Sequence, residues 1–300
     1  MNIGFIGLGI MGKPMALNLL KAGYNVKAFD INEQSRQAVV AEGASNANSP
    51  KEAAESNDVI ITMLPNASII ENVLFGKNGV NEGITSGAVI IDMSSVSQVD
   101  TLKWASHFED NNVSFIDAPV SGGEPKAIDG TMSIMVGGDK ATFQKVLPIL
   151  QAMGSEVTHV GKTGSGSTTK LANQILVNVT MAAMSEAVVL ASKSGVDVDK
   201  MYQAIRGGLA GSTVLDAKIP LILDRNFAPG GRIDINHKDL ANVLKAGESI
   251  GAPLPLTSSV AGMYQAMIEN GKSTDDHSGV VQYYEKLANY EVPKGGKHNE

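Results

Sequence analysis

Short apolar runs alternate with stretches of helical spacing through the first half of the chain. The apolar runs predict strands at Asn2–Ile6, Asn25–Phe29, Val59–Met63, Ala88–Asp92, Ser114–Asp117, Ser133–Val136 and Glu156–Val160. The spacing between them predicts helices at Lys13–Ala22, Asn32–Ala41, Lys51–Glu55, Gln98–Asn111 and Lys140–Met153. Strands that alternate with helices, and that are apolar on both faces, predict a sheet covered on both sides. We therefore expect an α/β, Rossmann-type domain with a mainly parallel sheet.

After Gly161 the pattern predicts helices with no convincing strand between them. The longest helix is expected over about 167–193, with apolar residues spaced for one buried stripe. That stripe consists of Leu171, Ile175, Leu176, Val179, Ala183, Met184, Ala187 and Leu190. Further helices are expected at Asp199–Arg206, Lys238–Ser249, Ser258–Asn270 and Ser278–Ala288. The chain is thus predicted to form a Rossmann-type domain at 1–162 and an all-α domain at 163–300, with a polar tail at Val292–Glu300 that frays.

The composition argues against several classes of protein. The 300 residues carry a net charge of -7 and lack the basic stripe that binding to nucleic acid requires. Cysteine is absent, which excludes disulfides, thiolate nucleophiles and zinc–thiolate sites. No unbroken run of about 18 apolar residues occurs, so no membrane span is predicted and a cytoplasmic location is expected.

A glycine-rich turn follows the first predicted strand. It reads Gly7, Leu8, Gly9, Ile10, Met11 and Gly12. The three glycines suit, in order, a tight turn, a close approach of the backbone to a pyrophosphate, and close packing of a helix on a strand. The N-terminus of the following helix offers N–H donors and a positive dipole to phosphates. The turn therefore predicts a bound dinucleotide.

An acidic residue ends the second predicted strand. Asp30 lies eighteen positions after Gly12, where a carboxylate bonds the ribose hydroxyls of the dinucleotide. A carboxylate there would repel a 2′-phosphate, and neither Ile31 nor Asn32 is basic. NAD is therefore the expected cofactor, with NADP as the alternative.

Three further strands end in loops whose residues suit ligand binding. These loops are Met63-Leu64-Pro65-Asn66, Asp92-Met93-Ser94-Ser95 and Asp117–Gly123. In open α/β sheets, ligands bind at the carboxyl ends of the parallel strands. Ser121, Gly122 and Gly123 offer successive N–H groups and a hydroxyl to an anion, such as a substrate carboxylate. Each loop alone also fits an ordinary turn, so their joint placement carries the prediction.

Lys170 lies in the first turns of the long predicted helix. Asn173 and Gln174 follow at i+3 and i+4, so the three side chains share one face. A lone helical lysine is usually a solvated surface residue. At the junction of two predicted domains and beside two amides, it is equally a candidate catalytic group.

These motifs together resemble those of the β-hydroxyacid dehydrogenase family, from Met1 to about Val292. The resemblance rests on Gly7–Gly12, Asp117–Gly123, Lys170–Gln174 and Lys238-Asp239, which match the cofactor, substrate, catalytic and second cofactor motifs respectively. A closer likeness to a branch that reduces small carboxylate semialdehydes is carried by Gly4–Met15, Ser121–Gly130, Ala204–Lys218 and Asp224–Phe227.

The resemblance implies a role for individual residues. Lys170 is the implied catalytic acid and base. The implied substrate contacts are Ser121, Gly122, Gly123, Asn173, Gln174 and Ser212. Many members carry Asn at the position of Gln174, so the resemblance does not decide which of Asn173 and Gln174 meets the substrate. The implied cofactor contacts are Gly7, Gly9, Ile10, Met11, Gly12, Asp30, Met63, Leu64, Pro65, Asn66, Ser95, Phe227 and Lys238.

These roles predict an NAD-dependent oxidoreductase in which Lys170 donates a proton to the carbonyl oxygen of a small semialdehyde. The sequence does not rank two-carbon, three-carbon and methylated semialdehydes, but no Arg/Lys cluster suggests a phosphorylated one. A non-enzymatic module that senses the dinucleotide is the alternative, although a sensor would not need Lys170. No metal is expected, because the cluster Asp275–His277 is better explained as a helix cap. The family implies a homodimer or homotetramer.

Overall fold

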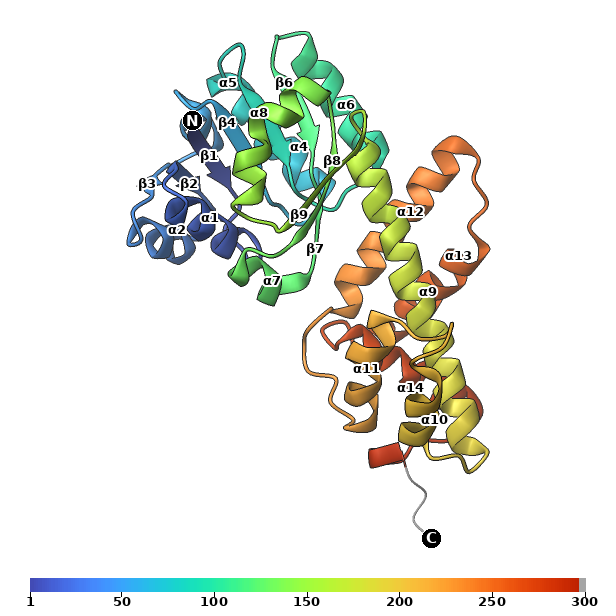
Figure 1. The fold of residues 1–300 in the computed structure, drawn as a ribbon. Helices are drawn as coiled ribbons and strands as arrows, with labels where there is room; N and C mark the ends of the chain where they lie inside the picture. Colours follow the sequence, from blue (N-terminus) through green and yellow to red (C-terminus); the bar gives the residue numbers. More distant parts are fainter. Residues whose placement is uncertain (297–300) are drawn as a thin grey trace. The chain divides into compact units, whose positions relative to one another are not determined.

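The computed structural model describes residues 1–296. The chain forms two compact units, and the first ends at Leu171 while the second begins at Ala172. The division falls within the long helix α9, Ser165–Lys193, drawn in yellow-green in Figure 1.

The first unit is built on a sheet whose strands pair in the order β3-β2-β1-β4-β5-β6-β8-β7, with β9 also on β8. The strands are β1 (Asn2–Ile6), β2 (Asn25–Phe29), β3 (Ser45–Asn46), β4 (Val59–Thr62), β5 (Val89–Asp92), β6 (Ser114–Asp117), β7 (Val120–Ser121), β8 (Ser133–Gly137) and β9 (Glu156–Gly161). The strands from β3 to β6 are parallel, β8 is antiparallel to both β6 and β7, and β9 is parallel to β8. The predicted α/β fold with a mainly parallel sheet is confirmed.

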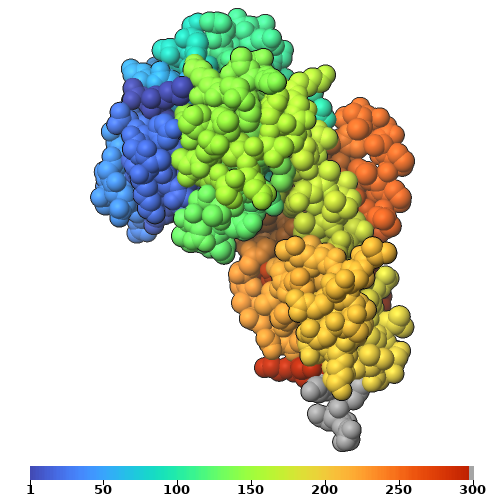
Figure 2. Space-filling view, viewed as in Figure 1, coloured from blue at the N-terminus to red at the C-terminus, as the bar shows by residue number. Residues whose placement is uncertain are grey.

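Helices cover both faces of this sheet (Figure 1). They are α1 (Gly12–Lys21), α2 (Glu33–Val40), α3 (Pro50–Ala54), α4 (Ala67–Phe75), α5 (Val80–Gly83), α6 (Gln98–Glu109), α7 (Gly123–Asp129) and α8 (Lys140–Gln151). Alternate residues of β4 enter different cores, Val59 and Ile61 on one side and Ile60 on the other. The chain's single tryptophan, Trp104 of α6, is fully buried in the latter core and donates to Glu71 Oε2 at 3.1 Å. In Figure 2, α8 and β9 form much of the visible surface of this unit.

The second unit is helical, as predicted. After α9 come α10 (Val198–Ile205), α11 (Thr213–Leu223), α12 (Ile233–Ile250), α13 (Pro255–Glu269), the 3-10 turn η1 (His277–Val280), α14 (Val281–Ala288) and the 3-10 turn η2 (Lys294–Gly296). Its core gathers side chains from all of these α-helices, among them Met184, Tyr202, Ile219, Leu240, Tyr264 and Val281.

The stripe predicted for α9 is partly wrong. Leu171 and Met184 are buried, but Leu176 and Leu190 are 70% and 71% exposed. The buried stripe runs instead through Gln174, Asn178, Met181, Ser185, Val188 and Ser192. Its polar members are hydrogen-bonded, for example Tyr264 Oη to Asn178 Oδ1 at 2.8 Å. A polar side chain is buried at low cost when it is paired, and the apolar spacing does not register such pairs.

Four helices were not predicted, namely α4, α5, α7 and α11. Two of them begin at side chains that cap them, since Asn66 accepts from Ile69 N and Ser212 accepts from Leu215 N. Pro220 lies inside α11, where proline normally ends a helix, and it obscured the helical pattern.

The predicted fraying of the tail is wrong for Val292–Gly296. Val292 is fully buried, and its N–H donates to Glu285 Oε1 at 2.9 Å. Residues 297–300, the rest of the predicted tail, lie outside the described residues.

By length and composition, α9 also meets the criteria for a membrane-spanning helix, with a mean hydropathy of 1.7 over 18 residues. Counting unbroken apolar runs missed this because Asn173, Gln174 and Asn178 interrupt them. Half of that window is buried inside the protein, and a core helix meets the same criteria, so the finding is weak support for a membrane role.

Candidate active site

The glycine turn joins β1 to α1 in a tight backbone arrangement. Gly7 has a φ of +100°, and a Cβ on it would lie 2.3 Å from Met63 O. A Cβ on Gly12 would lie 1.9 Å from Gly7 O, so this glycine permits the helix to approach the turn. At Gly9, by contrast, nothing lies within 4 Å of a Cβ. The open space beside an exposed Gly9, at the N-terminus of α1, fits the close approach of a pyrophosphate.

Asp30 directly follows β2 and is fixed by two backbone donors. Its Oδ2 accepts from Leu8 N at 2.6 Å, and its Oδ1 accepts from Asn32 N at 2.7 Å. The carboxylate is therefore tied to the glycine turn. Each oxygen retains a further lone pair for a ribose hydroxyl. Ile31, beside it, is 91% exposed.

The ends of β4 and β5 are joined through Asp92. Its Oδ1 accepts from Thr62 Oγ1 at 2.8 Å and from Ser94 N at 3.2 Å. Ser94 Oγ in turn accepts from Leu64 N at 2.9 Å. Burial raises the pKa of Asp92 to about 6, although the hydrogen bonds from Ser94 and Thr62 oppose that rise. The predicted cofactor loops are thus held by a buried carboxyl group.

The remaining predicted contacts at these strand ends have different surroundings. Met63 and Leu64 are half-buried, Pro65 is exposed, and Ser95 is half-buried one residue after Ser94. Asn66 caps α4, which gives its side chain a structural role. Ile10 is exposed and Met11 half-buried at the start of α1.

Asp117, at the end of β6, anchors the start of α9. Its two oxygens accept from Gly164 N and Ser167 N, both at 2.7 Å. Burial raises the pKa of Asp117 above its ordinary value, against the effect of these hydrogen bonds. Gly166 lets the helix approach the sheet closely, since a Cβ there would lie 2.4 Å from Met135 O. One turn further along this anchored segment, the side chain of Lys170 is buried.

The predicted carboxylate loop lies between β7 and α7. Ser121 ends β7, in register with Ser133 of β8, and is half-buried. Gly122 and Gly123 have φ values of +136° and +70°, which side chains rarely adopt. Both glycines are exposed, so their backbone is accessible to a ligand.

In the second unit, α9 and α12 meet through a buried hydrogen bond. Gln174 Nε2 donates to Asp239 Oδ2 at 2.7 Å, and Asn173 Nδ2 donates to Gln174 Oε1 at 3.0 Å. Lys238 Nζ lies 3.1 Å from Asp239 Oδ1. The structure thus brings together Asn173, Gln174 and the Lys238-Asp239 motif.

Ser212 and Phe227 lie elsewhere in the second unit. Ser212 is the N-cap of α11. Phe227 packs against the helical core with the guanidinium of Arg225 5.2 Å from its ring centre, and its carbonyl accepts from Asp276 N at 3.0 Å. Neither is joined to Gln174 by a hydrogen bond in the described part of the chain.

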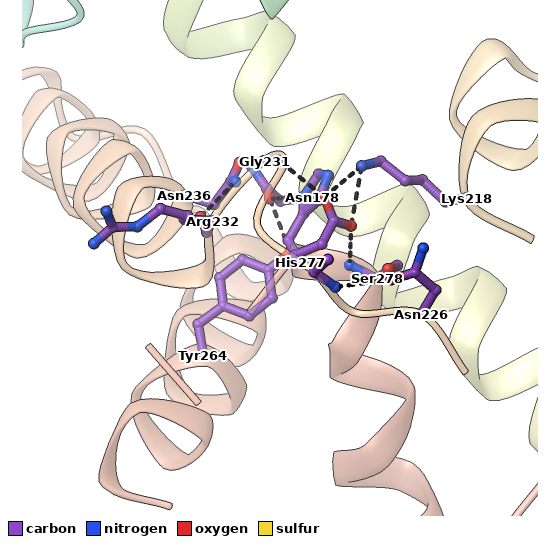
Figure 3. Close-up of polar contacts among 11 residues, drawn as sticks. Asn178, Lys218, Asn226, Gly231, Arg232, Asn236, Tyr264, His277 and Ser278 are labelled. Atoms are coloured by element: carbon purple, nitrogen blue, oxygen red, sulfur yellow. Dashed lines mark hydrogen bonds and ion pairs between the residues drawn. The ribbon is translucent and has the colours of Figure 1, made fainter. Parts of the chain in front are cut away.

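His277, the last residue of the cluster Asp275–His277, belongs to a buried polar network (Figure 3) that also includes Asp276. Asp276 accepts from Lys218 Nζ at 2.8 Å and from Gly231 N at 2.8 Å, and it caps η1 through Ser278 N. Burial and, to a smaller extent, the nearby Lys218 ammonium lower the pKa of His277 to about 4. The network explains this cluster as structural. Among residues 1–296 no group of acidic and histidine side chains is arranged to hold a metal ion.

The predicted site residues divide between the two units. The glycine turn, Asp30, the strand-end loops and Lys170 lie in the first unit, whereas Asn173, Gln174, Ser212, Phe227 and Lys238 lie in the second. The roles of Asp92, Asp117 and Asp239 were not predicted. For the first two the signal is present, because each directly follows the apolar residues of a buried strand, as Asp30 does.

Together, the parallel sheet, the glycine turn with its open Gly9 and the carboxylate after β2 define a Rossmann-type domain that binds a dinucleotide. Comparisons with known proteins agree. Residues 2–161 match the NAD binding domain of 6-phosphogluconate dehydrogenase, and residues 164–284 match the NAD-binding domain of NADP-dependent 3-hydroxyisobutyrate dehydrogenase. The chain belongs to the β-hydroxyacid dehydrogenase family.

Relatives cover nearly the whole chain. The 2-(hydroxymethyl)glutarate dehydrogenase of Eubacterium barkeri is 41% identical over 98% of both chains. The 2-hydroxy-3-oxopropionate reductase of Escherichia coli is 39% identical over 97% of this chain and 100% of its own. The structure of Mycobacterium tuberculosis 3-hydroxyisobutyrate dehydrogenase with L-serine has a TM-score of 0.89 at 31% identity, over 94% of this chain and 98% of that one. The chain is therefore an oxidoreductase that acts on CH–OH groups.

Proposed function

We propose that the protein reduces tartronate semialdehyde (2-hydroxy-3-oxopropanoate) to D-glycerate with NADH, reversibly. The proposal is supported by the similarity to 2-hydroxy-3-oxopropionate reductase over the full length of that enzyme. The observation that carries it is the buried Lys170, held one turn beyond the anchor that Asp117 makes with the start of α9.

In this proposal each part of the chain has a chemical task. Bound NADH supplies the hydride that reduces the aldehyde carbon. Lys170, as an ammonium, donates a proton to the aldehyde oxygen, so that the C=O bond becomes a CH–OH group. In the oxidative direction the neutral amine accepts that proton. The backbone of Ser121, Gly122 and Gly123 binds the substrate carboxylate, which holds the carbonyl carbon in place.

The preference for NADH rests on Asp30 and its neighbours. Asp30 presents a carboxylate at the ribose position, and the exposed residue after it is Ile31, which offers no positive charge to a 2′-phosphate. The guanidinium of Arg36 donates to Asp30 O at 2.5 Å and is thereby engaged with the backbone. Kd values for NADH and NADPH, measured by titration, test this preference; tighter binding of NADPH contradicts it.

A second candidate is the oxidation of 2-(hydroxymethyl)glutarate, because the relative with that activity is 41% identical. A third candidate is the oxidation of 3-hydroxyisobutyrate, because the structural neighbour is named as a 3-hydroxyisobutyrate dehydrogenase. All three alcohols share the unit HOCH2–CHR–COO⁻. The group R is a hydroxyl in D-glycerate, a carboxyethyl group in 2-(hydroxymethyl)glutarate and a methyl group in 3-hydroxyisobutyrate. The candidates therefore differ only in R.

A panel of substrates decides between them. We expect kcat/KM with NADH to be highest for tartronate semialdehyde when it is compared with methylmalonate semialdehyde and succinic semialdehyde. D-Glycerate and 2-(hydroxymethyl)glutarate are compared in the oxidative direction with NAD⁺. A dominant rate on any other substrate overturns the proposed substrate. Tight NADH binding without turnover of any of them would favour the dinucleotide sensor.

We further propose that the protein is a homodimer or homotetramer. The support is the row of exposed apolar residues on α9, of which Leu176 and Leu190 are 70% and 71% exposed. Sedimentation velocity at micromolar concentration measures the mass directly, and a monomer of 31.4 kDa contradicts the proposal.

A further inference from the structure

Three hydrogen-bonded side chains in the second unit form a relay. It runs from Asp239 on α12 through Gln174 to Asn173, both on α9. Asp239 and Gln174 are buried, at 4% and 7% exposure, so water competes little for their hydrogen bonds. The relay ends at Asn173, which is half-buried.

The carboxylate sets the direction of every bond in this relay. An ionised carboxylate only accepts hydrogen bonds, so Gln174 must turn its NH2 group towards Asp239. The Lys238 ammonium lies 3.1 Å from the other carboxylate oxygen. The carbonyl oxygen of Gln174 then accepts from Asn173, which must also present its NH2 group. Asn173 is left with its own carbonyl oxygen, an acceptor, for another partner.

Asn173 lies three residues after the proposed acid–base in the same helix. Side chains at i and i+3 share one face of a helix, with Cβ atoms roughly 5–6 Å apart. In a substrate of the form HOCH2–CHR–COO⁻, the reacting oxygen and R are on neighbouring carbons. A substrate whose oxygen meets Lys170 therefore brings R within reach of Asn173.

We propose that Asn173 selects the substituent R and that Asp239 is the residue that positions it, through Gln174. The acceptor offered by Asn173 favours an R that donates a hydrogen bond, a hydroxyl, over a methyl or carboxyethyl group. This inference rests on the proposed function and answers which of the two amides meets the substrate. An R without a donor leaves the Asn173 carbonyl oxygen unpaired, which is expected to lower kcat/KM roughly 10–100-fold.

The test compares D-glycerate with 3-hydroxyisobutyrate in the oxidative direction, in the wild type and in relay variants. Gln174→Leu removes the middle side chain of the relay. Asp239→Asn replaces a group that only accepts by an amide that both donates and accepts, so the donor in each hydrogen bond of the relay is no longer fixed. In each variant, the ratio of the two kcat/KM values is expected to fall at least about fivefold. The double variant Gln174→Glu with Asp239→Asn places the carboxylate at the middle of the relay. Asn173 then again donates inwards, and the ratio is expected to recover.

A matched control separates this positioning role from general damage to the fold. Asp276→Asn makes the same chemical change at another buried carboxylate of the second unit. It is expected to lower the melting temperature but to leave the ratio unchanged. L-Serine, in which R is an ammonium group that also donates hydrogen bonds, is the third substrate. A kcat/KM for L-serine above that for D-glycerate overturns the inference that R is a hydroxyl.

The outcomes distinguish the inference from the proposed function. If the wild type prefers D-glycerate but both single variants keep the wild-type ratio, the relay does not select R and the proposed function stands. If the wild type prefers 3-hydroxyisobutyrate, the proposed substrate and the inference are both overturned. If the wild type binds NADH and turns over no substrate of the panel, the proposed function itself is wrong.

Discussion

Carboxylates organise both units, but their partners are mainly backbone N–H groups in the first unit and include a side chain of another segment in each case in the second. In the first unit they lie at or just after strand ends and accept from the backbone N–H groups of a loop or a helix start, as at the half-buried Asp30 and the buried Asp92 and Asp117. Asp92 also accepts from the side chain of Thr62. In the second unit each accepts from a side chain of another segment, as in the pairs Asp239–Gln174, Asp276–Lys218 and Glu285–Arg225. Asp276 and Glu285 accept from backbone N–H groups as well.

The difference bears on how each unit tolerates change. A loop held through its N–H groups keeps its shape when its side chains vary, because every residue except proline has that donor. A pair of side chains depends on both partners, and the loss of one leaves the other buried without a partner. We therefore expect substitutions that alter substrate choice to concentrate in the second unit.

The largest expected effect is at Lys170, next to the boundary between the units. Lys170→Met removes the proposed proton donor, so kcat is expected to fall about 10²–10⁴-fold while the Kd for NADH stays unchanged. Steady-state kinetics and a binding titration measure the two quantities. The control is Lys162→Met, at an exposed lysine shortly before α9, which is expected to behave like the wild type. Normal turnover by the Lys170 variant contradicts the assignment.

Asp117→Ala tests the backbone anchors of the first unit. It leaves the N–H groups of Gly164 and Ser167 without their acceptor, which is expected to cost about 3 kcal/mol in the free energy of unfolding. Urea unfolding followed by circular dichroism measures the loss. Asp139→Ala removes an exposed cap of α8 and should cost only about 1 kcal/mol. Equal losses in the two variants would show that burial does not strengthen the anchor.

Two glycines of the turn separate ligand binding from packing. Gly9→Ala places a methyl group in open space, so stability is expected to hold while the Kd for NADH rises about tenfold. Gly12→Ala places it 1.9 Å from Gly7 O and is expected to cost about 1–3 kcal/mol of stability. Isothermal titration measures the Kd for NADH, and thermal unfolding measures the stability, in both variants. Unchanged NADH affinity in the Gly9 variant contradicts the proposed position of the pyrophosphate.

The smallest expected effect is a pH dependence at Asp92. Burial raises its pKa to about 6, so the folded state binds a proton more tightly than the unfolded state. The carboxyl group therefore stabilises the fold as the pH falls through about 6, and this contribution is lost as the pH rises above that value. Between about pH 8 and pH 5 the gain is about 1 kcal/mol. Asp92→Asn should abolish this gain in the free energy of unfolding, measured with urea. If the variant keeps the same dependence on pH, another group is responsible for it.

Much of the first unit was predictable because its elements repeat a simple pattern. β1, β2 and β6 begin and end at the predicted residues, since apolar runs and turn residues mark both ends. The short helix α7 was missed because it begins inside the predicted carboxylate loop and its first residue is Gly123. The cofactor turn was likewise predictable, because its glycines serve backbone geometry that any side chain would disturb.

In the second unit, local sequence patterns do not predict which face of α9 is buried. The true buried face of α9 carries Gln174, Asn178 and Ser185, which reads as a polar face until their partners are known. Asp239, 65 positions after Gln174, supplies one of those partners. Nothing in the neighbourhood of either residue predicts that pairing, because it is set by the packing of α12 on α9. The relay is for that reason a product of the tertiary structure alone.

The burial of Trp104 has a practical consequence. As the chain's single tryptophan, it lies in the core of the first unit, beside Phe108 and hydrogen-bonded to Glu71. Its fluorescence therefore reports on that unit alone, whereas the far-ultraviolet signal of helices comes from both. If the two signals change at different urea concentrations, the units melt independently; if they coincide, the long helix couples them into one cooperative transition.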